Sequence, residues 1–435
     1  MSTLLVLSDL GPVGRLERRR NGLLQFTYDE QWRLMEGSFP VSCRMPVTRA
    51  LHLQEQLLPW LRGLISENRA QLDDWCTRLK LDAKALHSSP PVLFDFLSKT
   101  GTDLAGALSF IPLRRARQIK GPVPAESREA FLKRFDKKAL SSRLDALADK
   151  PGTARLTEDK DFFCLSGAQP KTALYRDKRG WALPQGPVPT THILKPPALP
   201  YDGLAENEHL CLLLARLSGL EAASSEILKT SSGQSVLAVE RFDRLESTAG
   251  LLRLHQEDLC QAMGYGPEHK YELDGGPSAV ALYSFIKDVS DNPADPDNFL
   301  KALAFNWAIG GIDNHARNHA LLLAHGHQTL LAPLYDLISI APYKDIEKRR
   351  LSLHIGNKIK IGRINRRQWH KLAAAINLTE DAIDQLVSGL LNNLLSALKG
   401  DVFDREVTRL DHKVGFTLRD ELIKHTEKCI NDLNS

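Results

Sequence analysis

Apolar positions change their spacing several times along the chain, and each spacing predicts a different kind of element. Residues 3 to 28 alternate short runs of Leu, Val, Phe and Tyr with turn pairs such as Asn21-Gly22, which is typical of short antiparallel strands. From Leu57 to about Leu108 the apolar spacing becomes helical and is interrupted at Pro90-Pro91. The chain therefore predicts a small β-rich unit at its start, joined to helices.

The middle of the chain predicts a second set of strands. Segment 121 to 160 is rich in Lys, Glu and Asp, and its helical part is expected to stop at Asp149-Lys150-Pro151-Gly152. This composition predicts a linker or a loosely packed helical connection. A helix is expected from Leu204 to Leu217. Strand-like runs occupy 162–165, 171–176, 181–182, 191–194 and 236–242.

The remainder, from Gln256 to the end, predicts mainly helices. Thr379 is a suitable N-cap, and the apolar residues from Ala382 to Leu398 recur on one helix face, which predicts a core stripe. Strands with one helix, followed by a helical region, are the element order of a two-lobed kinase. We therefore predict an α+β protein- or lipid-kinase-like fold. Its expected parts are a β-rich amino-terminal subdomain (1–120), a kinase N-lobe (121–245) and a helical C-lobe (246–435).

Composition narrows the class of protein. The chain has 435 residues, of which 43% are apolar and 25% charged, as in an ordinary globular enzyme of several lobes. Its longest apolar runs, such as Cys211 to Ala215, are far shorter than the roughly 20 residues of a membrane span, and we expect neither a span nor a targeting leader. The six cysteines are scattered without a CxxC pair, so we expect free thiols and a cytoplasmic location.

Net charge alone does not identify a ligand, because +4 is only mildly basic. The basic residues are clustered, however, and each cluster is either a solvated face or a contact with phosphate, in ATP or in DNA brought close by a partner. The clusters are Arg18-Arg19-Arg20, Arg114-Arg115-Ala116-Arg117 with Lys120, Lys348-Arg349-Arg350, and the segment from Lys358 to Arg367.

Three residues match the demands of phosphoryl transfer, which needs a carboxylate to orient the attacking hydroxyl, ligands for Mg²⁺ and a cation on the phosphates. Asp313 and Asn318 have the D-x-x-x-x-N spacing of a kinase catalytic loop. Asp336 follows the strand-like Thr329-Leu330-Leu331 and can supply a second metal carboxylate. The spacing alone is a weak signal, because any long chain contains it by chance; the later aspartate and an upstream strand lysine strengthen it.

An upstream cation and a loop complete the candidate site. Lys195 ends a strand-like run from which it can reach ATP phosphates, and Glu208 in the next helix can pair with it; the alternative is a surface lysine and a solvated glutamate. Ser166 to Thr172 offers a small-residue turn for phosphates, although it is not a Walker A motif and the chain has no GxGxxG. Glu240-Arg241-Phe242, at a strand end, can present its backbone to adenine or simply form a salt bridge.

Other catalytic classes have weaker support. His315 and His319 are four residues apart and could share a helix face as metal ligands, but no H-E-x-x-H motif accompanies them. His325 and His327 lie beyond a turn. A Ser/His/Asp hydrolase is equally weak, since the chain has no G-x-S-x-G elbow.

Eight segments, in order, resemble one known family. They are Cys164–Leu174, Pro189–Lys195, Asn207-Glu208, Ala238–Arg244, Gln256–Asp258, Asp274–Pro277, Asp313–Asn318 and Tyr335-Asp336. Across nearly the whole chain they closely resemble the HipA family of bacterial kinase toxins. The resemblance implies a Ser/Thr kinase toxin that uses ATP and Mg²⁺, paired with a small helix-turn-helix (HipB-like) antitoxin that binds operator DNA. It also implies an aminoacyl-tRNA synthetase as substrate, the glutamyl enzyme being the first candidate, with growth arrest and persistence as the result.

The resemblance also implies a role for each matched residue. Asp313 would be the catalytic base, and Asn318 and Asp336 would be the Mg²⁺ ligands. Lys195 would be the phosphate lysine, held by an ion pair with Glu208. The residues implied to lie next to ATP are Ser166, Gly167, Ala168, Gln169, Lys171, Lys195, Glu240, Arg241, Phe242, His315, Arg317, Asn318, Tyr335 and Asp336.

One position departs from the family. Relatives usually carry a serine where this chain has Cys164, and autophosphorylation of that serine ejects the phosphate loop and inactivates the kinase. Cysteine is not an ordinary phospho-acceptor, so we expect Ser166, which matches a second serine in some relatives, to be the modified residue. The alternative is that this chain has lost the switch and relies on its antitoxin.

Two other functions remain open on the sequence. An inactive kinase fold could act only as a co-repressor on DNA together with its antitoxin. A small-molecule phosphotransferase also uses D-x-x-x-x-N followed by a later aspartate, so Asp313 to Asp336 does not separate it from a protein kinase. The family-like amino-terminal unit favours the protein kinase.

Overall fold

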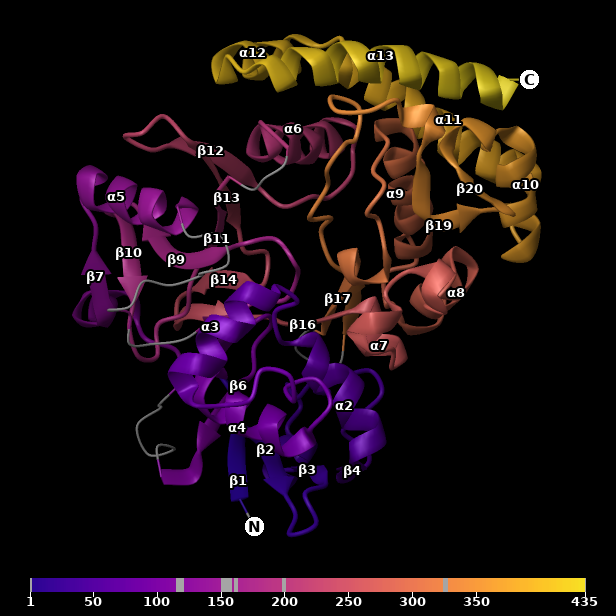
Figure 1. Cartoon of the computed structure of the whole chain (residues 1–435). Helices are drawn as coiled ribbons and strands as arrows, with labels where there is room; N and C mark the ends of the chain where they lie inside the picture. Colours follow the sequence, from indigo (N-terminus) through magenta and orange to yellow (C-terminus); the bar gives the residue numbers. More distant parts are fainter. Residues whose placement is uncertain are drawn as a thin grey trace.

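The computed structural model describes residues 2–114, 121–149, 159, 163–197, 201–323 and 328–434. The chain begins with an N-terminal unit whose antiparallel sheet has the order β4-β3-β2-β1-β6, at the lower end of Figure 1. The predicted short strands and turns are confirmed. The break predicted at Pro90-Pro91 is the start of α4, where proline costs no hydrogen bond. The elements of the unit are β1 (Ser2–Ser8), β2 (Gly11–Arg18), β3 (Leu24–Tyr28), α1 (Glu30–Leu34), β4 (Leu51–Leu53), α2 (Gln54–Gly63), α3 (Arg69–Leu79), α4 (Pro90–Thr100), β5 (Asp103–Leu104) and β6 (Ser109–Pro112).

A single aromatic-rich core holds the N-terminal unit together. Trp60 of α2 is almost fully buried, with its ring 6.0 Å from that of Phe110 in β6. Trp75 of α3 is buried in the same core and stacks on Phe96 of α4 at 6.1 Å. Helices α2 and α3 lie on the side of the unit that faces the rest of the molecule (Figure 1), so the turn between them is brought close to the lobes described next.

The N-lobe is built on a six-stranded sheet in the order β12-β13-β11-β9-β10-β7. The predicted linker at 121–160 is wrong for its central part, because β7 is the edge strand of this sheet. Leu144 of α5 packs on the sheet next to Trp181 and Leu194, so this helix belongs to the lobe. The helix stops at Asp149 as predicted, while Lys150, Pro151 and Gly152 lie outside the described residues. The elements are β7 (Leu132–Arg134), α5 (Lys137–Ala148), β9 (Thr172–Asp177), β10 (Gly180–Pro184), β11 (His192–Lys195), α6 (Leu204–Leu217), β12 (Ser225–Lys229) and β13 (Ser235–Glu240).

Two strands of this region differ from expectation. Strand β12 was not predicted, because its residues are only partly buried or exposed and show no apolar alternation. The strand expected at 162–165 is β8 (Phe163–Cys164), which pairs in parallel with β5 of the N-terminal unit instead of joining the N-lobe sheet; Phe162 lies outside the described residues. The chain therefore enters the phosphate-loop segment from a strand that the N-terminal unit holds.

The C-lobe is mainly helical, as predicted, and shares one core with α6. Helix α11 begins after Thr379, whose hydroxyl accepts a hydrogen bond from the amide of Ala382. Most of the predicted stripe is buried, and Ala382, Leu386 and Leu395 at its edges are partly buried. Helices α12 and α13 cross the end of the molecule opposite the N-terminal unit (Figure 1). The helices are α7 (Leu259–Met263), α8 (Ala279–Val289), α9 (Asp295–Ile309), α10 (Arg366–Ala375), α11 (Glu380–Leu398), α12 (Asp401–Leu410) and α13 (Lys413–Asn434). The strands of the C-lobe are β16 (His255–Asp258), β17 (Ala320–Leu323), β18 (Thr329–Leu331), β19 (Arg350–Ile355) and β20 (Lys358–Lys360). The hairpin of β14 (Arg244–Ser247) and β15 (Gly250–Arg253) packs on the N-lobe, where Leu251 shares a small core with Tyr175 and Ala182.

The metal hypothesis based on histidine spacing does not fit the structure. His315 and His319 flank a 3₁₀ turn, Ala316–Asn318, so they do not share a helix face. His325 and His327 lie outside the described residues, and no cluster of His, Cys, Asp and Glu suited to a metal occurs among those that are described. All six cysteines are unpaired, as predicted.

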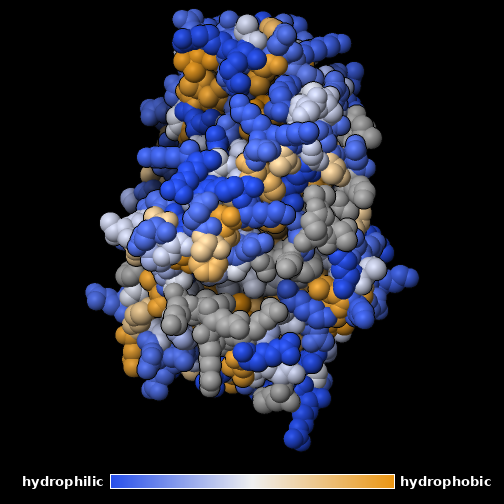
Figure 2. Space-filling view, turned by 90° about the vertical axis from the view of Figure 1, so that its left-hand side faces the viewer, coloured by the Kyte–Doolittle hydropathy of each residue, from blue (hydrophilic) through white to orange (hydrophobic). Residues whose placement is uncertain are grey.

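In the described ranges, no helix has both the length and the apolar character needed to cross a membrane. The described part of the face that carries α5 and β7 is mostly hydrophilic, with apolar side chains in separate groups (Figure 2). Of the basic clusters, Arg350, Lys358 and Lys360 are exposed on β19 and β20, whereas Arg115, Arg117 and Lys120 lie outside the described residues.

Candidate active site

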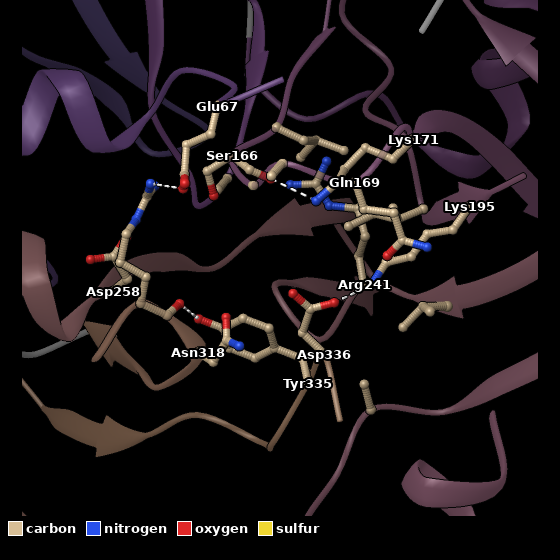
Figure 3. A pocket seen from close by; sticks show the side chains of 18 of the residues that line it. Glu67, Ser166, Gln169, Lys171, Lys195, Arg241, Asp258, Asn318, Tyr335 and Asp336 are labelled. Carbon is tan, nitrogen blue, oxygen red and sulfur yellow. Dashed lines mark hydrogen bonds and ion pairs between the residues drawn. The ribbon is translucent and has the colours of Figure 1, made fainter. Parts of the chain in front are cut away.

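One cavity of about 370 Å³ lies where the N-lobe, the C-lobe and the N-terminal unit meet. Its size is in the range of small-molecule sites. It brings together every residue that the sequence singled out for the site. These lining residues are Ser166, Gly167, Ala168, Gln169, Lys171, Lys195, Glu208, Glu240, Arg241, Phe242, Asp313, His315, Arg317, Asn318, Tyr335 and Asp336. Figure 3 shows several of them around the cavity, including Lys171, Lys195, Asn318 and Asp336.

The predicted ion pair of Lys195 is present and has a second partner. The ammonium Nζ at the end of β11 is 2.6 Å from Oε1 of Glu208 in α6 and 2.5 Å from Oδ1 of Asp336. Burial disfavours the charge of Lys195, but the two carboxylates outweigh burial and raise its pKa. Burial likewise disfavours the charge of Asp336, but its neighbouring lysines outweigh it and lower the pKa of that carboxyl. Both groups are therefore charged at neutral pH.

A second lysine lies under the candidate phosphate loop. Lys171 Nζ donates a hydrogen bond to the carbonyl of Ser166 at 2.7 Å, and this bond links the two ends of the loop. Gly167 has φ +102°, and a Cβ there would lie 2.6 Å from the same Nζ, which explains why a glycine occupies this position. Burial and the nearby charge of Lys195 lower the pKa of Lys171 to about 8.

The catalytic-loop candidate follows α9 and lies at the mouth of the cavity. The side chain of Asp313 is 60% exposed, and its Oδ1 accepts a hydrogen bond from the Tyr271 hydroxyl at 2.7 Å. Asn318 Nδ2 donates to the main-chain carbonyl of Asp313 at 2.7 Å, which ties both ends of the D-x-x-x-x-N segment together. His315 packs edge-on against Tyr271, and burial lowers its pKa, so it is neutral at neutral pH.

Arg317 lines the cavity with its guanidinium already engaged. It is ion-paired with Asp258 at 2.9 Å and with Glu67, and its Nη2 donates to the carbonyl of Gly63 at 2.8 Å. Burial opposes its charge, but the carboxylates outweigh burial and raise its pKa. The hydroxyl of Tyr335 donates to the main-chain carbonyl of Arg317 at 2.7 Å. Arg317 thus anchors the catalytic segment to its neighbours.

Arg241, expected in an adenine hinge, turns its side chain into a buried ion network. Its guanidinium is 2.8 Å from Asp243 and 3.6 Å from Asp103 of the N-terminal unit. Arg244 pairs with Asp103 at 2.9 Å, so these charges compensate one another away from solvent. The amide of Arg241 donates to the carbonyl of Thr191 at 2.9 Å. The side chain of Arg241 therefore stabilises the strand end between Glu240 and Phe242. The role of these residues as an adenine hinge stays a prediction.

Several cavity residues were missed by sequence reasoning. Glu67 comes from the turn after α2, far along the chain from the catalytic segment, and no motif marks it. Lys270 lines the cavity, and Tyr271 reaches the site through its hydrogen bond to Asp313. Both lie shortly before the family-like segment Asp274–Pro277, which was the only available signal for them. Glu257 of β16 is buried and accepts a hydrogen bond from the amide of Cys43 at 2.6 Å; burial raises its pKa to about 7.

The fold and the cavity define a two-lobed, kinase-like protein with an added N-terminal unit. Residues 4–111 match the family model described as the HipA N-terminal domain, and residues 163–398 match the one described as the HipA-like C-terminal domain. The chain belongs to the HipA family.

Named relatives agree with this assignment. The chain is 31% identical over 388 residues to the putative kinase Y4mE of Sinorhizobium fredii, which covers 89% of this chain and 88% of that protein. It is 26% identical over 335 residues to the serine/threonine-protein kinase toxin HipA of Shewanella oneidensis, covering 74% and 71%. A solved structure described as the Shewanella oneidensis MR-1 toxin antitoxin system HipA, HipB and its operator DNA complex covers 99% of this chain and 98% of its own, with a TM-score of 0.80 at 22% identity. The fold is thus shared over the whole chain.

Proposed function

We propose that this protein is an ATP- and Mg²⁺-dependent Ser/Thr protein kinase. The observation that carries the proposal is Lys195, held between Glu208 and Asp336 in a cavity that Asp313 and Asn318 also line. Such a set supplies a phosphate cation, metal-binding oxygens and a carboxylate for the attacking hydroxyl, which are the requirements of phosphoryl transfer. The exposed carboxylate of Asp313 favours an acceptor on another protein, because a hydroxyl on a macromolecular surface can reach it.

The residues present fit both ATP and Mg²⁺. Asp336 and Asn318 offer oxygen ligands, and Mg²⁺ is usually bound by one or two carboxylates together with substrate phosphates rather than by a complete protein cage. The ammonium of Lys195 lies against Asp336, so that carboxylate already holds a cation. When bound, Mg²⁺ would neutralise charge that develops on the phosphates. Lys171 and Lys195 both line the cavity and lie near each other, so their ammonium groups would bind the phosphate oxygens of ATP.

The reaction divides between the two ends of the cavity. The acceptor hydroxyl hydrogen-bonds to Asp313, which orients it and receives its proton as the new oxygen–phosphorus bond forms. The bond between the terminal phosphorus and the bridging oxygen of ATP breaks, and ADP leaves. Lys195 and Lys171 compensate the charge of the phosphates, and Asn318 fixes the main chain of Asp313.

We extend the proposal to the biological role. Family membership supports a toxin that works in the cytoplasm with a small helix-turn-helix antitoxin, and through it with operator DNA, as in the Shewanella assembly. The proposed substrate is an aminoacyl-tRNA synthetase, with the glutamyl enzyme as first candidate, so that tRNA charging stops and growth arrests. This choice rests on the family resemblance.

Autophosphorylation is proposed at Ser166. Cys164 is fully buried in the core of the N-terminal unit, and burial raises the pKa of its thiol to about 12, so it is both inaccessible and a poor nucleophile. Ser166 lines the cavity instead. Peptide mass spectrometry of the ATP-treated protein should find phosphate on Ser166 and none in the Ser166→Ala variant; phosphate at another residue would remove this assignment.

The central test uses radiolabelled ATP on a cell lysate, with Asp313→Gln as the matched variant. The wild type should label one or few proteins and arrest growth on expression, and Asp313→Gln should do neither, because the acceptor hydroxyl loses its orienting carboxylate. Label on a small molecule instead of protein would identify a small-molecule phosphotransferase. Repression of an operator without any ATP turnover would identify a co-repressor.

A further inference from the structure

The N-terminal unit contributes a carboxylate to the cavity between two cations of the C-lobe. Glu67, in the turn between α2 and α3, lines the cavity (Figure 3). Its Oε1 lies against Nη1 of Arg317, and its Oε2 is 2.7 Å from Nζ of Lys270. The Glu67 side chain is 20% exposed, and those of Arg317 and Lys270 are 4% and 16% exposed. Burial disfavours the charge of Glu67, but the two cations outweigh it and lower the pKa, so all three groups are charged.

The same turn holds the phosphate loop. The amide of Glu67 donates to the carbonyl of Gly167 at 3.2 Å, and the hydroxyl of Ser66 donates to that carbonyl at 3.3 Å. Asn68 Nδ2 donates to the carbonyl of Ala168 at 2.8 Å. Because β8 also pairs with β5 of the N-terminal unit, the loop is held by this unit both at its start and along its length.

A third set of contacts reaches the acceptor end. Lys270, fixed by Glu67, lies 5.3 Å from the centre of the Tyr271 ring, and the Tyr271 hydroxyl donates to Oδ1 of Asp313. Arg317, fixed by the same carboxylate, is in the segment that ends at Asn318. Glu67 is therefore connected to the phosphate loop, to the catalytic segment and to the acceptor carboxylate.

We infer that the N-terminal unit completes the phosphotransfer site and that Glu67 is the positioning residue through which it does so. The expected effect of Glu67 on kinase activity rests on the proposed function, whereas its expected effect on the position of the phosphate loop does not. Without the carboxylate, Arg317 keeps only Asp258 as an ion-pair partner, and Lys270 loses its anionic neighbour at the mouth of the cavity. Small displacements of reacting groups can cost about 10²-fold in rate.

The test compares Glu67→Gln with Asp9→Asn in the full-length protein. Both substitutions are near-isosteric and remove one negative charge. Asp9 also links the N-terminal unit to the rest of the chain, through Arg253 at 2.6 Å, and the side chains of Arg253 and Asp9 are 10% and 7% exposed. Neither Asp9 nor Arg253 lines the cavity, so Asp9→Asn controls for the loss of an interface ion pair.

The measurements are kcat and KM for ATP, the unfolding temperature, and amide hydrogen exchange of residues 166–169. Glu67→Gln should lower kcat about tenfold or more and speed exchange in the loop, whereas Asp9→Asn should shift only the unfolding temperature. Equal kcat values for Glu67→Gln and an active wild type overturn the inference and leave the proposed function intact. If the wild type transfers no phosphate, the proposed function fails, and the exchange of the loop alone decides whether Glu67 positions it.

Discussion

The two ends of the cavity hold their charges in different ways. At the phosphate end, Lys195, Glu208 and Asp336 are in direct contact, and the lysine and glutamate are almost completely buried. At the acceptor end, the carboxylate of Asp313 is 60% exposed and has a tyrosine hydroxyl as its hydrogen-bond donor. At the phosphate end, buried ion pairs hold the charged groups together. At the acceptor end, the exposed carboxylate of Asp313 depends on the hydroxyl of Tyr271 for its hydrogen bond. A rigid phosphate site and an open acceptor site suit one small donor and a large, separate substrate.

The largest expected effect is at the phosphate end. Lys195→Met removes the cation that two carboxylates share, and kcat/KM for ATP should fall on the order of 10³-fold, because a preorganised charge on the phosphates is lost. The free energy of unfolding should fall by about 3 kcal/mol, since the partners remain buried without their counter-ion. Steady-state kinetics and urea unfolding measure the two effects.

The control for Lys195→Met is Lys178→Met, at an exposed lysine in the turn before β10. Lys178→Met makes the same change of side chain, and both kcat/KM for ATP and the free energy of unfolding should stay close to the wild-type values. Should Lys195→Met retain near-normal activity, the ion-paired lysine would be structural, and the phosphate end would have to be organised by Lys171.

A smaller effect is expected at the acceptor end. Tyr271→Phe keeps the ring against Lys270 and His315 but removes the hydrogen bond to Asp313. We expect kcat to fall about tenfold with little change in KM for ATP or in stability, because the acceptor carboxylate loses its orientation while the phosphate end is untouched.

Tyr265→Phe, in the same segment but outside the cavity, is the matched control for Tyr271→Phe. A rise in kcat for Tyr271→Phe would contradict the expected role, since it would mean that the tyrosine hydroxyl competes with the substrate for Asp313. A rise in KM for ATP would instead connect Tyr271 to the phosphate end.

The same contrast separates what the sequence could predict from what it could not. Lys195, Glu208, Asp313, Asn318 and Asp336 lie in short segments that resemble the family in order along the chain, and this resemblance identifies them where the D-x-x-x-x-N spacing alone is a weak signal. Glu67 meets Arg317 only because the chain folds back over a separation of 250 residues, and no local pattern encodes that contact.

Errors in the predicted fold have a similar cause. The polar composition of 121 to 160 predicts a linker or a loosely packed helical connection, which fits helix α5 but hides the edge strand β7, because its partner β10 lies later in the chain. Strand β8 was assigned to the wrong sheet because its partner, β5, belongs to the N-terminal unit. Side-chain periodicity reports which face is buried but not which element buries it. Arg241 illustrates the same limit, since only the structure reveals Asp103 as its neighbour.

The smallest expected effect distinguishes the two lysines within the phosphate end. Lys171 has a pKa lowered to about 8 by burial and by Lys195, whereas the carboxylates around Lys195 raise its pKa. As pH rises through 8, Lys171 loses its charge while Lys195 keeps it, so only one of the two phosphate contacts weakens. The dissociation constant of a non-hydrolysable ATP analogue, measured by calorimetry, should increase between pH 7 and pH 9 by up to about tenfold, which is the change in the charged fraction of Lys171 over that interval. In Lys171→Arg the guanidinium stays charged, and the increase should disappear. A wild-type dissociation constant that is unchanged over this range, or an equal increase in Lys171→Arg, would mean that Lys171 does not contact the phosphates.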